Sequence, residues 1–145
     1  MLKLSKKADY GLIAVKHLAM RDARGACSAA DIAGVYGIPM PLMAKVLQKL
    51  AKHGLVTARH GSSGGYKLAR HPSTITALEV INAIDGPLFI TSCVTSRGEC
   101  YQTPTCTVRE PLRRVNESIL QVLGTVTISQ MSEEPPETSL IELET

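Results

Sequence analysis

Aromatic residues are nearly absent from this sequence, which has one Phe, four Tyr and no Trp among its 145 residues. Its core must therefore be built from aliphatic side chains. Long hydrophobic runs are also absent, because no uncharged stretch reaches the roughly 18 residues that a membrane-spanning helix needs. Charges at Lys3, Lys6 and Lys7 interrupt the N-terminal apolar residues, so we expect no signal peptide and a cytoplasmic location.

The sequence also lacks the closely spaced cysteine pairs that are typical of structural zinc sites. Three of its four cysteines, Cys93, Cys100 and Cys106, instead lie at wide spacing in one polar segment, CVTSRGECYQTPTC. Thiolate sulfur is a soft donor that suits zinc or iron. Wide spacing on a loop accommodates a cluster of several irons better than a single ion. The spacing therefore favours an iron–sulfur cluster.

Two other roles for these cysteines fit less well. Disulfide pairing leaves one of the three unpaired unless Cys27 joins, and disulfides are rare in a reducing cytosol. A catalytic thiol needs a partnering base, whereas all four histidines lie in the first half of the chain, at positions 17, 53, 60 and 71. We therefore expect no enzyme, with a redox enzyme that uses Cys100 as the alternative.

The charge of the chain is divided along its length. Residues 1–87 contain twelve Lys and Arg against five Asp and Glu, a formal +7, whereas residues 88–145 contain four against eight, a formal −4. A basic half followed by an acidic half is typical of a nucleic-acid-binding module joined to a second module, although a solvated helix face gives a similar count.

The basic half has the pattern of a helix-turn-helix. Ser5 is expected to cap a first helix over KKADYGLIAVKHLAMR, and Ser28 a short second helix that Gly37 ends. A Gly-containing turn then leads to a third helix, MPLMAKVLQKLAK. The N-terminal part of this last helix would enter a major groove. The candidate DNA-binding residues are Ser28, Met40, Pro41, Leu42 and Lys45, with Lys49 one turn later.

Two short strands are expected after the third helix, over Leu55–Ala58 and Tyr66–Ala69, and a Gly- and Ser-rich tip joins them. Strands in this place make a winged helix. The wing would lay Arg59 or His60 into a minor groove, where narrow A·T-rich tracts attract cationic side chains, and Ser62 is a further candidate contact. An ordinary surface loop is the alternative for this tip.

A further helix is expected over TALEVINAIDG, with Gly86-Pro87 as its stop. Beyond the cysteines, apolar residues recur at spacings of four, three, four and three, at Val108, Leu112, Val115, Ile119 and Val122. Such a stripe on a helix of about seventeen residues indicates a seam for a partner helix, and we expect dimerisation through it. Packing against the chain's own winged domain is the alternative.

The expected fold is mainly α with a small β-hairpin wing. We expect a winged helix-turn-helix DNA-binding domain over residues 1–87, an iron–sulfur cluster-binding loop over 88–107, a dimerisation helix over 108–132 and a disordered acidic tail over 133–145.

With these segments in place, the sequence resembles the winged-helix iron–sulfur regulators that include IscR, the nitric-oxide sensor NsrR and regulators of the SUF cluster-assembly operon. The resemblance covers about residues 2–132, through LKLSKKADYGLIAVKHLA, IPMPLMAKVLQKLAKHGLV, HGSSGGYKLAR, ITALEVINAIDG, the three cysteines and RRVNESILQVLGTVTISQM. The opening Ser-Lys-x-x-Asp-Tyr-Gly is most similar to the SUF-regulator branch.

The resemblance implies a homodimer with crossing C-terminal helices, in which each subunit binds a [2Fe-2S] or [4Fe-4S] cluster through three loop cysteines and a fourth ligand. In this chain the cysteines are Cys93, Cys100 and Cys106. The IscR branch uses a His three residues after the last cysteine, but that position is Arg109 here, and a guanidinium that stays protonated cannot ligate iron.

The NsrR branch uses an Asp near the start of the first helix of the other subunit, which aligns with Asp9. We therefore expect Asp9 of the partner subunit as the fourth ligand, with Glu110 or a small exogenous thiol as alternatives. The first cysteine spacing is one residue longer than the spacing common among relatives, so the number of irons is left open.

The resemblance implies a transcriptional regulator that binds a palindromic operator in double-stranded DNA. We expect a repressor of iron–sulfur assembly or of redox and stress genes, with the cluster state controlling operator binding, and no small-molecule substrate or membrane partner. The alternatives are a nitric-oxide-responsive repressor of the same family and an iron–sulfur carrier without DNA binding.

Overall fold

The structure is a computed structural model that describes residues 4–21, 25–61, 64–88 and 108–132. Three helices come first, α1 (Lys6–Met20), α2 (Ala29–Tyr36) and α3 (Met40–Lys52). Strands β1 (Val56–Arg59) and β2 (Gly65–Leu68) follow as an antiparallel hairpin. After a short 3-10 helix, η2 (Pro72–Thr74), come helices α4 (Ala77–Asp85), α5 (Arg109–Thr125) and α6 (Ile128–Ser132). The predicted fold class, mainly α with a hairpin wing, is confirmed.

The helices begin at the capping residues that the sequence predicts. Ser5 Oγ accepts a hydrogen bond from the Ala8 N–H at 3.0 Å at the start of α1. At α2 the side chains of Ser28 and Asp31 each accept from the other's backbone N–H, at 3.0 and 3.3 Å. These bonds satisfy N–H groups that have no partner within the helix. The caps therefore fix where the first two helices start.

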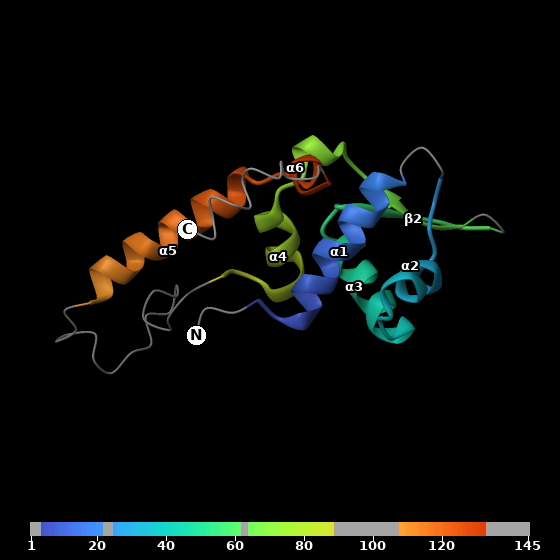
Figure 1. Ribbon diagram of the computed structural model, residues 1–145, viewed down its shortest axis with the longest axis horizontal. Helices are drawn as coiled ribbons and strands as arrows, with labels where there is room; N and C mark the ends of the chain where they lie inside the picture. The colour runs from blue at the N-terminus through green and yellow to red at the C-terminus, as the bar shows by residue number, and fades with distance from the viewer. Residues whose placement is uncertain (1–3, 22–24, 62–63, 89–107, 133–145) are drawn as a thin grey trace, which may run out of the picture.

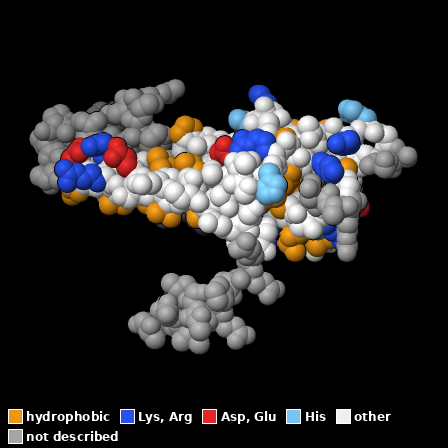
Figure 2. Space-filling model, turned by 90° about the horizontal axis from the view of Figure 1, so that it is seen from above, with side chains coloured by type: hydrophobic (Ala, Val, Ile, Leu, Met, Phe, Trp, Pro, Cys, Tyr) orange, Lys and Arg blue, Asp and Glu red, His pale blue; other side chains and the backbone are white. Residues whose placement is uncertain are grey.

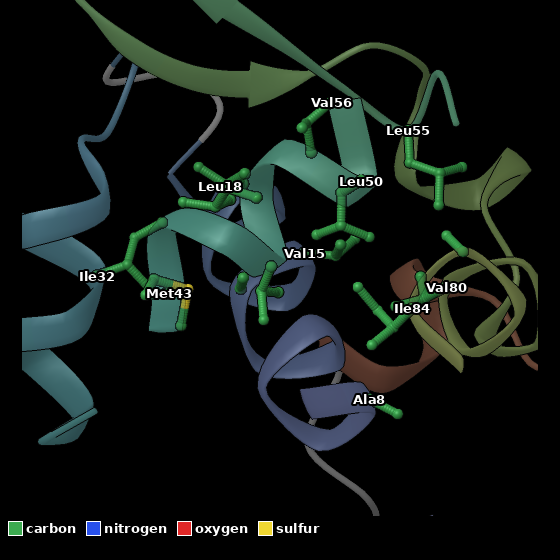
Figure 3. Packing of buried hydrophobic residues seen from close by; sticks show 14 of the residues in the cluster. Ala8, Val15, Leu18, Ile32, Met43, Leu50, Leu55, Val56, Val80 and Ile84 are labelled. Carbon is green, nitrogen blue, oxygen red and sulfur yellow. The ribbon is translucent and has the colours of Figure 1, made fainter. Parts of the chain in front are cut away.

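An aliphatic core joins the first three helices, the wing and α4. Figure 3 shows Val15 and Leu18 of α1 pointing toward Met43 and Leu50 of α3, with Val56 of the wing above them. Helix α1 lies at the centre, because it contacts α3, α4, α6 and β2. The scarcity of aromatic residues has the expected consequence, since the fully buried side chains are aliphatic ones such as Ile32, Met43 and Leu47.

Helices α1 and α4 approach each other closely at Gly11. A Cβ atom at this position would lie 3.0 Å from Ile84 Cγ1 and 3.4 Å from Val80 Cγ1. Glycine inside a helix costs about 0.5–1 kcal/mol relative to alanine. Here its lack of a side chain lets α4 lie directly against the backbone of α1.

The wing is anchored to the segment that precedes α2. The Cys27 N–H donates to Tyr66 O at 3.0 Å, and the Tyr66 N–H donates to Cys27 O at 2.7 Å. Strand β1 lies one residue later than predicted and β2 one residue earlier, because pairing continues to Arg59 opposite Gly65. Gly65 has a φ of 143°, and a Cβ atom there would lie 2.5 Å from the Cys27 carbonyl carbon. Only glycine therefore allows this close approach.

The long helix α5 extends away from the wing, as Figure 1 shows, and α6 returns to the N-terminal helices. The Ala77 N–H donates to Val126 O at 2.8 Å, and the Ile128 N–H donates to Ile75 O at 2.9 Å. Ile128 is fully buried. The C-terminal end of α5 is therefore fixed to the winged unit. Among the helices of the described ranges, none combines the length and hydrophobicity needed to cross a bilayer.

Replacing Gly65 with Ala should destabilise the protein. The backbone conformation alone costs about 1–3 kcal/mol for a residue with a side chain, and the overlap with Cys27 adds to this cost. Urea unfolding followed by circular dichroism measures the loss. Gly34→Ala is the matched control, because Gly34 lies in α2 with open space around it and should gain stability. Equal stability of Gly65→Ala and wild type would contradict the close approach.

Candidate DNA-binding surface and cluster ligands

The turn between α2 and α3 has the geometry of a helix-turn-helix. Gly37 ends α2 in the left-handed conformation, with a φ of 65°. The next N–H, of Ile38, donates to Ala33 O at 3.0 Å, and the Ile38 side chain is buried. Pro39 then leads directly into α3. This tight turn holds the two helices against each other.

Helix α3 buries one face and exposes three of its four residues that the sequence predicts as the main DNA contacts. Met43, Val46, Leu47 and Leu50 form the buried face. Met40 is 49% exposed. Pro41 and Lys45 are also exposed, whereas Leu42 is half-buried. Ser28 is half-buried at the start of α2, and its side chain is engaged in the cap.

The predicted wing residues lie at the end of β1. Arg59 is the last residue of the strand rather than part of the tip, and His60 follows it; both are exposed. Ser62 lies outside the described residues. Figure 1 shows the wing, α2 and α3 at the end of the molecule opposite α5. On the face seen in Figure 2, Lys, Arg and His outnumber Asp and Glu at this end, whereas basic and acidic side chains lie side by side at the start of α5.

Two basic residues of this half are engaged in internal contacts that the sequence pattern did not indicate. Lys49 Nζ donates to the backbone oxygen of Ile84 at 3.2 Å. Arg70 forms an ion pair with Glu79 at 2.8 Å. Burial alone would raise the pKa of Glu79, but hydrogen bonds from Arg70 and from the Thr76 N–H hold it below its usual value. These cations fix α4 to α3 and to the end of the wing.

A buried histidine joins α1 to α2. His17 Nδ1 lies 2.9 Å from the Tyr36 hydroxyl oxygen, and the two rings meet edge to face with centroids 5.4 Å apart. Burial, assisted by nearby Arg21, lowers the pKa of His17 below its ordinary value. Tyr36 is itself 43% exposed, and neighbouring Val35 is 59% exposed, so the last two residues of α2 leave much of their apolar surface in solvent.

The expected ligands of the cluster fall in two parts of the chain. Cys93, Cys100 and Cys106 lie outside the described residues. Asp9 is exposed in the first turn of α1. It lines a depression of about 460 Å³ together with Leu4, Ser5, Lys6 and Asp85. Within residues 4–21, 25–61, 64–88 and 108–132, no group of three or more His, Cys, Asp or Glu side chains is placed to hold a metal.

The apolar stripe of α5 has an exposed edge. Val108, Val115 and Val122 are 52%, 49% and 61% exposed, whereas Leu112 and Ile119 are half-buried. Figure 2 shows hydrophobic side chains in a row along this helix. Arg113 contacts both Glu110 and Glu117 on the same helix. Glu110, an alternative fourth ligand, is therefore paired with an arginine.

The fold and the exposed start of α3 define a winged-helix DNA-binding protein. The family model Rrf2, described as an iron-dependent transcriptional regulator, matches residues 4–134. The chain belongs to this family. It is therefore a transcriptional regulator, a class of protein that acts on DNA, and not an enzyme.

Solved structures of other regulators are similar over nearly the whole chain. CymR (YrzC), the global cysteine regulator of B. subtilis, has 28% sequence identity and a TM-score of 0.76, over 91% of this chain and 97% of that one. IscR of T. potens has 27% identity and a TM-score of 0.73, over 96% of each chain. A putative transcriptional regulator from Listeria innocua has 26% identity and a TM-score of 0.77, over 95% of this chain and 91% of that one.

Acidification should lower the free energy of unfolding, because His17 becomes protonated. Because folding lowers the pKa of His17, the folded state favours the neutral imidazole. The stability that His17 contributes is therefore fully present above pH 6.5, its ordinary pKa, and is lost as the pH falls through the folded-state pKa. Urea unfolding between about pH 7.5 and 5 measures the effect. His17→Gln should show a shallower decline than wild type, whereas His60→Gln, on the exposed wing, should keep the wild-type decline. A wild-type decline in His17→Gln would contradict the assignment.

Proposed function

We propose that this Rrf2-family regulator binds an iron–sulfur cluster and that the cluster state controls its affinity for an operator. One observation carries the proposal: a family described as iron-dependent matches a chain that concentrates three cysteines, Cys93, Cys100 and Cys106, in fourteen residues. Repression of iron–sulfur assembly or stress genes is the mode of action we favour. The SUF-regulator branch stays a prediction within this family.

The chemistry of the donor set fits such a cluster. Three thiolates are soft ligands suited to iron, and the carboxylate of Asp9 lies exposed on α1, where a second subunit can reach it. We therefore propose Cys93, Cys100 and Cys106 with Asp9 of the partner subunit as ligands. When bound, the cluster would supply an iron centre that reacts with oxidants or nitric oxide or is lost when iron is scarce.

The DNA-binding part of the proposal rests on α3 and the wing. The exposed residues Met40, Pro41 and Lys45 would meet a major groove, and Arg59 and His60 an adjacent minor groove. The exposed edge of α5 supports a homodimer, because three valines left in water are stabilised when a second copy covers them. A two-fold dimer reads a palindromic operator whose half-site spacing its geometry sets.

A second function is favoured by a specific observation. The structure matches CymR, described as a global cysteine regulator, as well as it matches IscR. A regulator of cysteine metabolism that binds no cluster is therefore the competing proposal. A cluster carrier without DNA binding is disfavoured by the family assignment. The colour of the isolated protein separates these functions.

Protein purified without oxygen should be coloured, and Cys100→Ala should abolish its visible absorption. The matched control is Cys27→Ala, because Cys27 is buried beside the wing and is not among the proposed ligands. Asp9→Ala should keep iron but shift the spectrum, since one ligand changes. Native mass spectrometry of the same samples measures cluster mass and dimer state together. A colourless, iron-free wild type would refute the proposal in favour of the cysteine regulator.

Replacing Lys45 with Ala should weaken operator binding by about 1–3 kcal/mol and relax base preference if the lysine contacts a base edge. Arg59→Ala should weaken binding with little change in the preference at the major groove. Gel shifts on a duplex that the wild type selects from a random pool measure both effects. Lys52→Ala, at the opposite end of α3, is the charge-matched control. Full affinity in both Lys45→Ala and Arg59→Ala would move the DNA-binding surface elsewhere.

A further inference from the structure

The C-terminal end of α4 is a junction of three helices. Asp85, the last residue of α4, precedes Cys93 by eight residues in the sequence. The end of this helix contacts both the start of α1, which carries Asp9, and α3, whose N-terminal half carries the proposed DNA contacts. The contacts that define this junction are all made by residues between Ser5 and Asp85, and none of these contacts involves the cysteine segment.

Lys49 connects the junction to α3. Its ammonium group donates to the Ile84 backbone oxygen at 3.2 Å, across 35 residues of sequence. The last carbonyl groups of a helix have no partner within it and carry the negative end of the helix dipole, so a lysine is favoured there. Lys49 and Lys45 lie one turn apart on α3. A movement of the end of α4 would therefore act directly on the helix proposed to meet DNA.

Ser5 and Asp85 connect the junction to α1. Ser5 Oγ donates to Asp85 Oδ1 at 2.7 Å while it also accepts from the Ala8 N–H as the cap of α1. A carboxylate at a helix C-terminus is unfavourable in isolation. Here Asp85 lies beside the N-terminus of α1, where a negative charge is favoured. This departure from local preference indicates a role in tertiary structure rather than in forming α4.

Close packing makes the junction stiff. Ile84 is 5% exposed and contacts the backbone of α1 at Gly11, where no side chain intervenes. Tightly packed elements shift between discrete arrangements rather than deform smoothly. The end of α4 therefore cannot move without displacing α1, α3 or both.

We propose that Lys49 and Asp85 are positioning residues that couple the cluster state to operator affinity within each subunit, through the end of α4. This inference rests on the proposed function and adds to it a route inside the chain. Neither residue is proposed to bind iron or DNA bases.

The test measures coupling rather than affinity. Five forms of the full-length chain are each prepared with the cluster and after its removal. They are the wild type, Lys49→Met, Lys49→Arg, Asp85→Ala and Lys52→Met. The dissociation constant for the duplex selected by the wild type is measured for both forms, and the ratio of the two constants is the coupling. Visible absorption and thermal unfolding establish that each variant holds the cluster and is folded.

Lys49→Met should bring the ratio at least about fivefold closer to one, since couplings of this size are typical of allosteric links. Asp85→Ala should act in the same direction. Lys49→Arg keeps a cationic donor and should keep the wild-type ratio. Lys52→Met loses the same charge from an exposed position on α3 and should also keep it. A direct contact of either lysine with a DNA phosphate would change the dissociation constants of both forms equally and leave their ratio unchanged.

The outcomes separate the two proposals. A wild-type ratio of one would overturn control by the cluster and, with it, the coupling route. A second outcome is that the wild-type ratio differs clearly from one while both Lys49→Met and Asp85→Ala keep that ratio. This result would leave the proposed function intact and refute the route through α4. An equal loss of coupling in Lys52→Met would also refute it. If Lys49→Met does not fold, Asp85→Ala decides.

Discussion

The packing of α1 directly on α4 at Gly11 is the constraint on which the rest of this structure depends. Because Gly11 has no side chain, Ile84 and Val80 of α4 lie close to the backbone of α1. The same approach brings Asp85 to the cap of α1 and the Ile84 carbonyl within reach of Lys49. Helix α1, in which an internal glycine costs stability, thus becomes the centre around which α3, the wing and α6 are arranged.

The molecule combines a tightly connected winged unit with one helix that projects from it. Helix α6 returns to α1 and fixes the end of α5 through backbone hydrogen bonds at Ala77 and Ile128. The valine edge of α5 stays exposed along the rest of its length. This arrangement is compatible with the proposed dimer, because the exposed edge of α5 lies away from the wing and the start of α3.

Much of the fold was predictable because local signals and tertiary packing agree. The caps at Ser5 and Ser28, the glycine that ends α2 and the length of α5 all follow from residue chemistry at helix ends and from apolar spacing. The polar contact that joins α2 to α1 was not predicted. Tyr36 fits an apolar face by its spacing, yet its hydroxyl contacts His17 and its ring is partly exposed. Periodicity cannot distinguish burial from a polar contact at the edge of a core.

The sequence by itself determined the class of protein, the order of its helices and the clustering of three cysteines, because these are properties of neighbouring residues. It could not determine which lysine of α3 is engaged in a contact inside the protein. Lys45 and Lys49 have the same chemistry and lie one turn apart, but only the fold places the end of α4 beside Lys49. It also could not show why Gly65 is required, because the backbone that it must accommodate, at Cys27, is 38 residues away in sequence. Contacts between distant segments depend on how whole helices pack, and that was decided by the tertiary structure alone.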